Sequence, residues 1–251
     1  AFKGFTKQYP FGAWNASLAG HWNDAIRGSS ALRAALLRRV QDEAATLLGV
    51  SVSTLFVDVQ NFSANRQGAE FKDLPDAEFT ERYGWYFDML NVTVIPNMRR
   101  IQNAARKAGV EVMYTTIESL TRDGRDRSLD YKITGFNVPK GSWDGKVIDQ
   151  ISPEEDEIVL PKSSSSVFVS THIDYVLRNL GVKQLVISGL ITDQCVESAV
   201  RDACDLGYLV TQITDACLTY SQARQDNSIY TIRGYCRQIT TEELVAELNG
   251  D

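Results

Sequence analysis

The chain has 251 residues, of which 43% are hydrophobic and 23% are charged, and its 26 basic and 32 acidic side chains give a net charge of -6. These values are typical of a globular protein with a sizeable core. The acidic balance argues against a general binder of nucleic acid or membrane surfaces. No apolar run approaches the ~20 residues that span a bilayer, and the first residues lack the apolar stretch of a signal peptide.

The numbers and spacing of cysteine and histidine residues exclude further classes of protein. The four cysteines are separated by 9, 13 and 19 positions and form no CxxC pair, so neither a disulfide scaffold nor a zinc ribbon is expected. We therefore expect a reduced, cytoplasmic protein. Only two histidines occur, His21 and His172, and neither has a partner pattern. The sequence predicts no metal and no other cofactor.

The chain divides into an N-terminal segment, residues 1–49, and one domain, residues 50–251. The first thirty residues are rich in aromatic side chains without a clear period, which indicates an arm or cap on the body or on a partner subunit. A helical spacing of apolar residues then runs from Ser30 to Gly49.

Short apolar runs alternate with helical patterns through the rest of the chain. Strands are expected at 55–59, 110–116, 157–160, 184–188 and 208–213, and helices at about 96–108, 173–180, 193–206 and 241–248. Pro96 opens the first of these helices, and Pro161 ends the third strand. Residues 60–76 and 121–145 read as loops. This alternation predicts a single three-layer, Rossmann-like α/β domain with a mostly parallel sheet flanked by helices.

Three chemically active side chains fall at or just beyond predicted strand ends: Asp58, Lys162 and Cys195. The carboxyl ends of parallel strands share one edge, so all three are expected there. Cys195 opens a helix, where the dipole and a nearby lysine would lower the pKa of the thiol. A carboxylate could take the thiol proton, and backbone N–H groups could bind an oxyanion.

Each residue also has an ordinary structural reading. A lone cysteine is more often a small buried hydrophobe, and a lone lysine is more often on the surface. Asp58 is harder to dismiss, because a carboxylate inside an apolar strand is costly unless it is paired. Cys204, Cys217 and Cys236 lack a comparable context and are interpreted as structural.

Taken together, the motifs resemble those of the isochorismatase-like cysteine hydrolases. The resemblance lies in Val57-Asp58-Val59-Gln60-Asn61, Leu160-Pro161-Lys162 with Ser166, Phe168 and Thr171, Gly189 to Ser198 around Cys195, and Asp215-Ala216 placed after a strand. It covers roughly residue 50 to the C-terminus.

The resemblance implies an Asp–Lys–Cys triad. Asp58 would be the general base, Lys162 would hold the thiolate, and Cys195 would attack a carbonyl carbon. It also implies a cis peptide between Leu190 and Ile191, which would aim the N–H groups of Ile191 and Cys195 at the oxyanion. Gln60, Asn61, Leu190 and Ile191 are the implied substrate-binding residues.

Within the family, Lys140-Gly141-Ser142-Trp143-Asp144 and Ile158 to Lys162 are similar to ureidoacrylate and carbamoyl amidohydrolases. This implies hydrolysis of a C–N bond in a small amide or ureide, by a homo-oligomer (dimer or tetramer). Many relatives carry Arg where this chain has Ser164. No histidine follows Asp73 or Asp76 in the pattern with which nicotinamidase relatives bind a metal.

Two other functions stay open. One is a vinyl-ether hydrolase that converts isochorismate, and the other is a non-catalytic binding protein on the same fold. Six aromatic residues could line a pocket or could belong to the core or an interface: Trp85, Tyr86, Phe87, Tyr131, Phe136 and Trp143.

Overall fold

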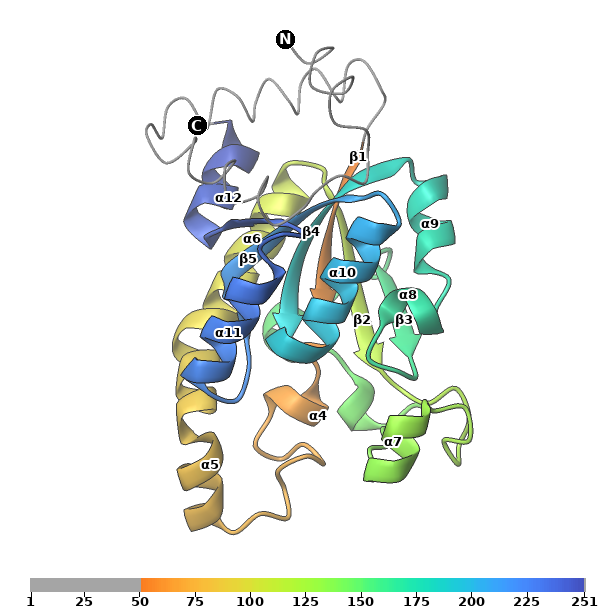
Figure 1. Ribbon diagram of the computed structural model, residues 1–251, viewed down its shortest axis with the longest axis vertical. Coiled ribbons are helices and arrows are strands. Elements are labelled where there is room, and N and C mark those ends of the chain that lie inside the picture. The colour runs from red at the N-terminus through yellow and green to blue at the C-terminus, as the bar shows by residue number, and fades with distance from the viewer. Residues whose placement is uncertain (1–50, 251) are drawn as a thin grey trace.

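Six parallel strands form the centre of the molecule, in the order β3-β2-β1-β4-β5-β6 (Figure 1). The structure is a computed structural model and describes residues 51–250, so the expected N-terminal arm and helix, and His21, lie outside the described residues. The strands are β1 (Ser51–Val57), β2 (Glu111–Ile117), β3 (Ile158–Lys162), β4 (Val182–Leu190), β5 (Leu209–Leu218) and β6 (Arg237–Ile239).

Helices cover both faces of the sheet, as parallel strands require. On one face lie α5 (Asp76–Met89), α6 (Ile95–Lys107) and α12 (Thr241–Asn249); on the other lie α8 (Val167–Ser170), α9 (Ile173–Asn179), α10 (Glu197–Asp205) and α11 (Gln222–Ile232). Alternate residues of β1 point to opposite faces. Phe56 therefore packs in the α5–α6 core, whereas Leu55 and Val57 pack in the α9–α10 core. The predicted three-layer α/β fold is confirmed.

Several predicted elements are found with small shifts at their ends. The expected helix beginning at Pro96 is α6, and Gly109 follows it with a positive φ of 68°, as a helix stop should. The helix expected from 193 is α10, preceded by a π-helical turn, η4 (Thr192–Val196). His172 is the N-cap residue of α9.

Two predicted boundaries are wrong. Pro161 does not end β3, because the strand continues through it to Lys162. Since β3 is an edge strand paired only with β2, a proline there costs no essential ladder bond. Asp215 does not follow its strand but lies inside β5. Its Oδ1 accepts hydrogen bonds from both the N–H and the Oγ1 of Thr241, so it fixes the start of α12.

Helix α5 was not predicted. Its apolar residues are mostly aromatic, and Phe79, Tyr83 and Phe87 recur every four residues, which is a helical period. It continues through η1 (Leu90–Val94), a π-helical turn, into α6. The N–H of Ile95 donates to Leu90 O five residues back, and Pro96, which has no N–H, follows. The wider turn lets the helical path pass the proline.

The polar C-terminal region also holds structure that its pattern did not indicate. Helix α11 begins after Ser221, whose side chain accepts a hydrogen bond from the N–H of Arg224, and β6 is only three residues long. Both segments expected to be loops contain short helices: α4 (Asn61–Ala64), α7 (Leu129–Thr134) and η2 (Trp143–Gly145).

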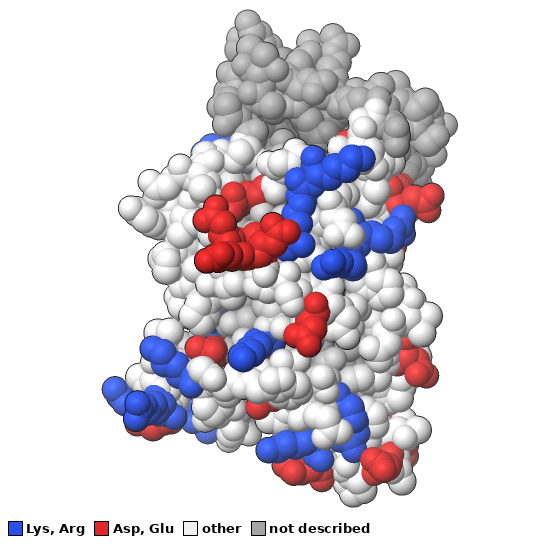
Figure 2. All heavy atoms as spheres, turned by 180° about the vertical axis from the view of Figure 1, so that it is seen from behind, with Lys and Arg blue, Asp and Glu red and all other residues white. Residues whose placement is uncertain are grey.

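The surface carries both signs of charge. On the face drawn in Figure 2, the acidic and basic side chains of the described residues lie in small, interspersed groups. Nucleic-acid binders instead concentrate Lys and Arg on one face.

Among the helices of residues 51–250, none has the length and apolar character needed to cross a membrane.

Candidate active site

The sheet brings the three predicted catalytic residues together at its carboxyl edge. Asp58 follows β1, Lys162 ends β3, and Cys195 lies in η4 after β4. The Lys162 Nζ lies 2.8 Å from Asp58 Oδ2 and donates a 3.3 Å hydrogen bond to Cys195 Sγ. All three are buried, with 2%, 0% and 4% of Asp58, Lys162 and Cys195 exposed. These contacts define one cluster, which we call the triad.

Asp58 is aimed by the backbone at the end of β1. It has a positive φ of 54°, the only such value among the non-glycine residues described. Aspartate tolerates this left-handed conformation better than most residues. The backbone N–H of Asp58 donates to Thr115 O at 3.0 Å, and Thr115 Oγ1 donates to Asp58 Oδ1 at 2.8 Å. Thr115 thus holds one carboxylate oxygen while Lys162 holds the other.

Lys162 is a buried cation with three partners. Besides Asp58 and Cys195, its Nζ donates to Ser164 O at 2.8 Å. Burial lowers the pKa of this ammonium, but the negative charge of Asp58 and the hydrogen bonds to Asp58 and Cys195 outweigh burial and raise it. Lys162 therefore stays protonated at neutral pH, because an anion lies beside it.

Cys195 is a neutral thiol in this arrangement. Burial raises its pKa from 9.0 to about 12; Lys162 lowers it, and Asp58 raises it. The sequence predicted a lowered pKa from the helix start and a nearby lysine. The lysine does lower the pKa of the thiol, but burial of the sulfur and the neighbouring carboxylate raise it by more. A thiolate must therefore be made during the reaction, by passing the proton to a base.

The turn before Cys195 has the expected backbone. The peptide between Leu190 and Ile191 is cis, which confirms that prediction. Gly189 precedes it with a φ of +139°, and a Cβ there would lie 2.2 Å from Val57 O. Only glycine therefore lets β4 approach β1 at this point. Leu190 and Ile191 are buried in the α5–α6 core.

Gln60 and Asn61 brace the loops around the triad. The Gln60 amide donates to Ile117 O and Asp144 O, and its oxygen accepts from the N–H of Ile117. Asn61 Nδ2 donates to Trp143 O at 3.0 Å. The structure thus places both beside the β2 end and η2, and the contacts seen are with backbone. A direct contact of either residue with substrate stays a prediction.

The six aromatic candidates form two groups and one single residue. Trp85, Tyr86 and Phe87 belong to the α5–α6 core, with Tyr86 fully buried. Trp143, in η2, stands apart and is 46% exposed.

Tyr131 and Phe136 form the second group. Their ring centroids are 4.6 Å apart, and Tyr131 is buried. Burial, followed by the charges of Cys195 and Asp58, raises the pKa of Tyr131. This pair therefore lies on the triad side of the molecule.

Sequence reasoning missed Thr115 and the carbonyl of Ser164 as partners of the triad. Thr115 is one residue of an ordinary β-forming run, and its role depends on the register of β1 against β2, in which Val57 lies opposite it. The Ser164 contact is made by backbone, which leaves no trace in residue type.

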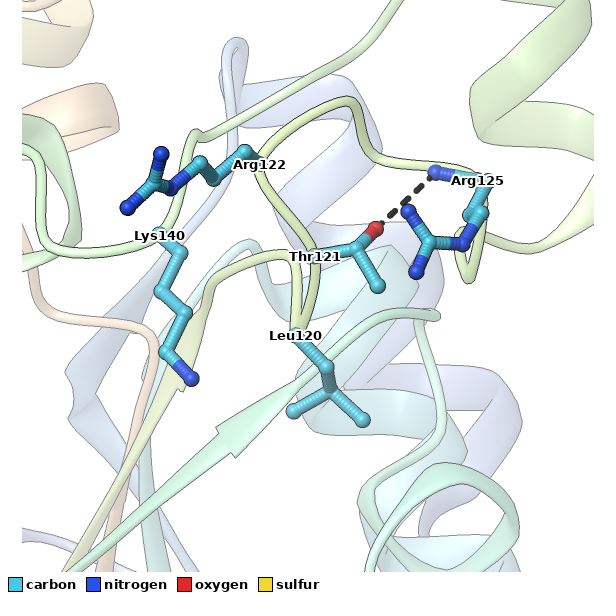
Figure 3. Close-up of a pocket in the computed structure, with 5 residues that line it drawn as sticks. All are labelled: Leu120, Thr121, Arg122, Arg125 and Lys140. Carbon is cyan, nitrogen blue, oxygen red and sulfur yellow. Dashed lines mark hydrogen bonds between the residues drawn. The ribbon is translucent and has the colours of Figure 1, made fainter.

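A hollow of about 590 Å³ lies on the connection between β2 and β3. Its lining is Leu120, Thr121, Arg122, Arg125 and Lys140 (Figure 3). The backbone N–H of Arg125 donates to Thr121 Oγ1 there. No triad residue lines this hollow.

In residues 51–250, no group of three or more His, Cys, Asp or Glu side chains could hold a metal ion.

Comparison with known proteins identifies relatives. The isochorismatase domain model matches residues 54–243. Ureidoacrylate amidohydrolase RutB of Rhizobium rhizogenes (strain K84 / ATCC BAA-868) is 32% identical over 166 residues, covering 57% of this chain and 67% of the relative. The RutB of Serratia proteamaculans (strain 568) is 28% identical over 210 residues, covering 77% of this chain and 80% of the relative.

Solved structures share the fold. A cysteine hydrolase from Pseudomonas syringae pv. phaseolicola has a TM-score of 0.66 at 23% identity and covers 79% of this chain and 92% of its own. N-carbamoylsarcosine amidase from Thermoplasma acidophilum has a TM-score of 0.58 at 22% identity, covering 77% and 98%. Because the family model spans residues 54–243, more than half of the chain, this chain belongs to the isochorismatase family of hydrolases.

Proposed function

We propose that the chain hydrolyses a C–N bond of a small amide, ureide or carbamoyl compound through a thioester on Cys195. The observation that carries the proposal is the triad itself, in which one buried ammonium contacts both a carboxylate and a thiol. A buried ion pair is costly to build. A neutral thiol beside it supplies a nucleophile that the pair can activate.

The first step is transfer of the thiol proton. Asp58 takes the proton of Cys195 as the sulfur attacks the carbonyl carbon of the substrate. Lys162 keeps its positive charge and offsets the negative charge that moves from Asp58 to sulfur and then to the carbonyl oxygen. Because burial raises the pKa of Cys195 to about 12, little thiolate exists before substrate arrives.

The tetrahedral intermediate needs donors for its oxyanion. The backbone N–H groups of Ile191 and Cys195, on the turn after β4, are proposed for this role. The intermediate then collapses: the C–N bond breaks, the nitrogen takes the proton from Asp58, and an amine or ammonia leaves. The acyl or carbamoyl group stays on sulfur as a thioester.

Hydrolysis of the thioester completes the cycle. Asp58, again a carboxylate, removes a proton from water as the water oxygen attacks the thioester carbon. The C–S bond breaks, and the sulfur recovers its proton from Asp58. An acyl group leaves as a carboxylic acid; a carbamoyl group leaves as carbamate, which decomposes to carbon dioxide and ammonia.

The amide and ureide class is supported by similarity in sequence. The two relatives named above are ureidoacrylate amidohydrolases by name, and this chain aligns with most of the length of each. The filled triad supports a cysteine mechanism over a non-catalytic role.

The test is ammonia release from a panel of ureidoacrylate, biuret, carbamoyl amino acids and nicotinamide by wild type and by Cys195→Ser. We expect release from at least one ureide or carbamoyl compound by wild type, and a loss of ~10³-fold or more in the variant. Cys204→Ser is the matched control and should retain activity.

Retained turnover in Cys195→Ser would contradict the thioester route. Pyruvate release from isochorismate, without ammonia from any amide, would instead assign the vinyl-ether reaction. A folded protein with neither activity would favour a binding role.

A further inference from the structure

The turn that carries Cys195 is held by side chains from another helix and not by a cap of its own. The turn η4 follows β4, and its N-cap residue, Ile191, has an apolar side chain and makes no capping hydrogen bond. A polar N-cap side chain is the usual means of fixing the first turn of a helix. Helix α11 packs against η4 and α10 on the same face of the sheet (Figure 1), so its side chains reach the turn.

The innermost contact joins Gln225 of α11 to Thr192 of η4. Thr192 Oγ1 donates a 2.8 Å hydrogen bond to Gln225 Oε1, and Gln225 Nε2 donates to Cys217 O at 3.0 Å. Cys217 lies in β5, opposite Gly189 of β4. The Gln225 amide therefore bridges the residue that follows the cis peptide and the strand beside the residue that precedes it.

Burial makes this contact specific. Thr192 is fully buried and Gln225 is 9% exposed. A hydrogen bond has a preferred length and direction, and a buried polar group that loses its partner is costly, so the pair holds Thr192 in one position. An apolar pair of the same shape stabilises a fold about as well but imposes no direction. The polar pair is therefore better explained by a requirement for position than by one for stability.

A second contact restrains the next residue of the turn from outside. Asp193 Oδ1 accepts a 2.7 Å hydrogen bond from Thr219 Oγ1, and Asp193 Oδ2 pairs with Arg224 Nε at 2.6 Å. The side chains of Arg224 and Asp193 are 41% and 20% exposed, and ion pairs in contact with water contribute little. We therefore assign the main restraint on the turn to the buried bond between Gln225 and Thr192.

We infer that Gln225 is a positioning residue that acts through Thr192. By fixing Thr192, it holds the adjacent N–H of Ile191, and the turn that leads to Cys195, in the geometry that the oxyanion requires. This inference rests on the proposed function, because the oxyanion forms only in that reaction. A misplacement of ~1 Å at such a site costs about 10²-fold in rate, so a single hydrogen bond that fixes the turn has a large effect on catalysis.

The experiment measures kcat and KM of Thr192→Val and Thr192→Ser for a ureide that wild type hydrolyses. Valine has nearly the shape of threonine but no hydroxyl, so Thr192→Val removes the bond with little change in packing. We expect kcat to fall by ~10–10²-fold, with KM within about twofold of wild type, because the loss falls on the transition state. Thr192→Ser keeps the hydroxyl and should retain kcat within about threefold of wild type.

Gln225→Leu tests the same bond from the other helix. It should lower kcat by a similar factor, and the double variant with Thr192→Val should be within about threefold of the slower single variant, because both changes remove one interaction. Alkylation of Cys195 by iodoacetamide needs no oxyanion donor, so its rate should stay within about twofold of wild type in all these variants. An alkylation rate that falls in parallel with kcat would show a disrupted triad and would overturn the positioning role.

Ser228→Ala is the matched control. Ser228 is a fully buried residue of the same helix, and its hydroxyl donates a 2.8 Å hydrogen bond to Glu197 Oε2 in α10, beyond the turn. Its loss should change kcat by no more than about twofold. Equal losses of kcat in Ser228→Ala and Thr192→Val, or wild-type kcat in Thr192→Val, would overturn the role of Gln225. Ammonia release that survives in Cys195→Ser would instead overturn the proposed function.

Discussion

Two carboxyl groups, the buried Asp58 after β1 and the half-buried Glu70 in the loop after α4, have opposite surroundings. Asp58 has an ammonium 2.8 Å away and a threonine hydroxyl on its other oxygen. Within residues 51–250, the hydrogen-bond partner of the Glu70 side chain is the Tyr220 hydroxyl, and the pKa of the Glu70 carboxyl group is raised from 4.5 to about 7, chiefly by burial. Of the two carboxyl groups, only Asp58 has a cation beside it among the described residues, and a paired cation offsets part of the cost of burying a carboxylate.

The difference suits two different tasks. A carboxylate held between a cation and a hydroxyl can accept a proton and return it within each reaction cycle. Among the described residues, Glu70 has no cation beside it and contacts no member of the triad. The contrast separates a carboxylate placed for proton transfer from one that is only removed from solvent, and the following variants test that separation.

Removing the cation should have the largest effect. In Lys162→Met, Asp58 is left buried without a counter-charge, so we expect a destabilisation of about 3–5 kcal/mol and a loss of activity of ~10³-fold or more. The pKa of Cys195 should rise further, because Lys162 lowers it. Denaturant unfolding measures the destabilisation, and turnover measures the loss of activity. The rate at which iodoacetamide alkylates Cys195 reports the change in the pKa of the thiol.

The matched control is Lys132→Met, since Lys132 is exposed on α7. If the unfolding free energy and the turnover change no more in Lys162→Met than in this control, the buried ammonium contributes neither to stability nor to catalysis.

Removing the base should lower activity while making the nucleophile more reactive. For Asp58→Asn we expect kcat/KM to fall by about 10²–10⁴-fold. Asp58 raises the pKa of Cys195 and Lys162 lowers it, so the thiol should ionise at lower pH and react faster with iodoacetamide near neutrality. Lys162→Met should shift the alkylation rate in the opposite direction. Slower alkylation in Asp58→Asn would contradict the electrostatic account in which Asp58 raises the pKa of Cys195.

Substitution of Glu70 should have the smallest effect, a change in unfolding free energy that depends on pH. A carboxyl group whose pKa is higher in the folded than in the unfolded state stabilises the fold at low pH. That contribution is lost as the pH rises from about 4.5 to about 7. The difference between these values corresponds to about 3 kcal/mol at most. The unfolding free energy of Glu70→Gln relative to wild type should therefore increase across this window, and the increase should be absent in Glu78→Gln, which alters a carboxylate of α5 that pairs with Arg82.

The triad could be predicted from sequence because each member has a local signal. Asp58 is a carboxylate in an apolar strand, and Lys162 and Cys195 occur in family motifs near strand ends. Parallel topology then brings them to one edge.

Glu70 had no such signal. Its partner Tyr220 lies 150 residues further along the chain, and the loop that holds it follows no period. Helix α5 did carry a helical period that was overlooked: Phe79, Tyr83 and Phe87 recur every four residues, and each contacts the Phe71 ring. The charge state of Cys195 also depended on depth of burial, which the sequence pattern did not give.

The central claim is that Cys195 becomes covalently acylated during turnover. The most direct test quenches wild type in acid within the first turnovers of a ureide substrate and measures the intact mass and the mass of the peptide that contains Cys195. The account predicts a mass increase equal to the acyl or carbamoyl group, located on Cys195 and absent in Cys195→Ser. Rapid turnover with no adduct on that peptide, and with activity preserved in Cys195→Ser, would contradict it.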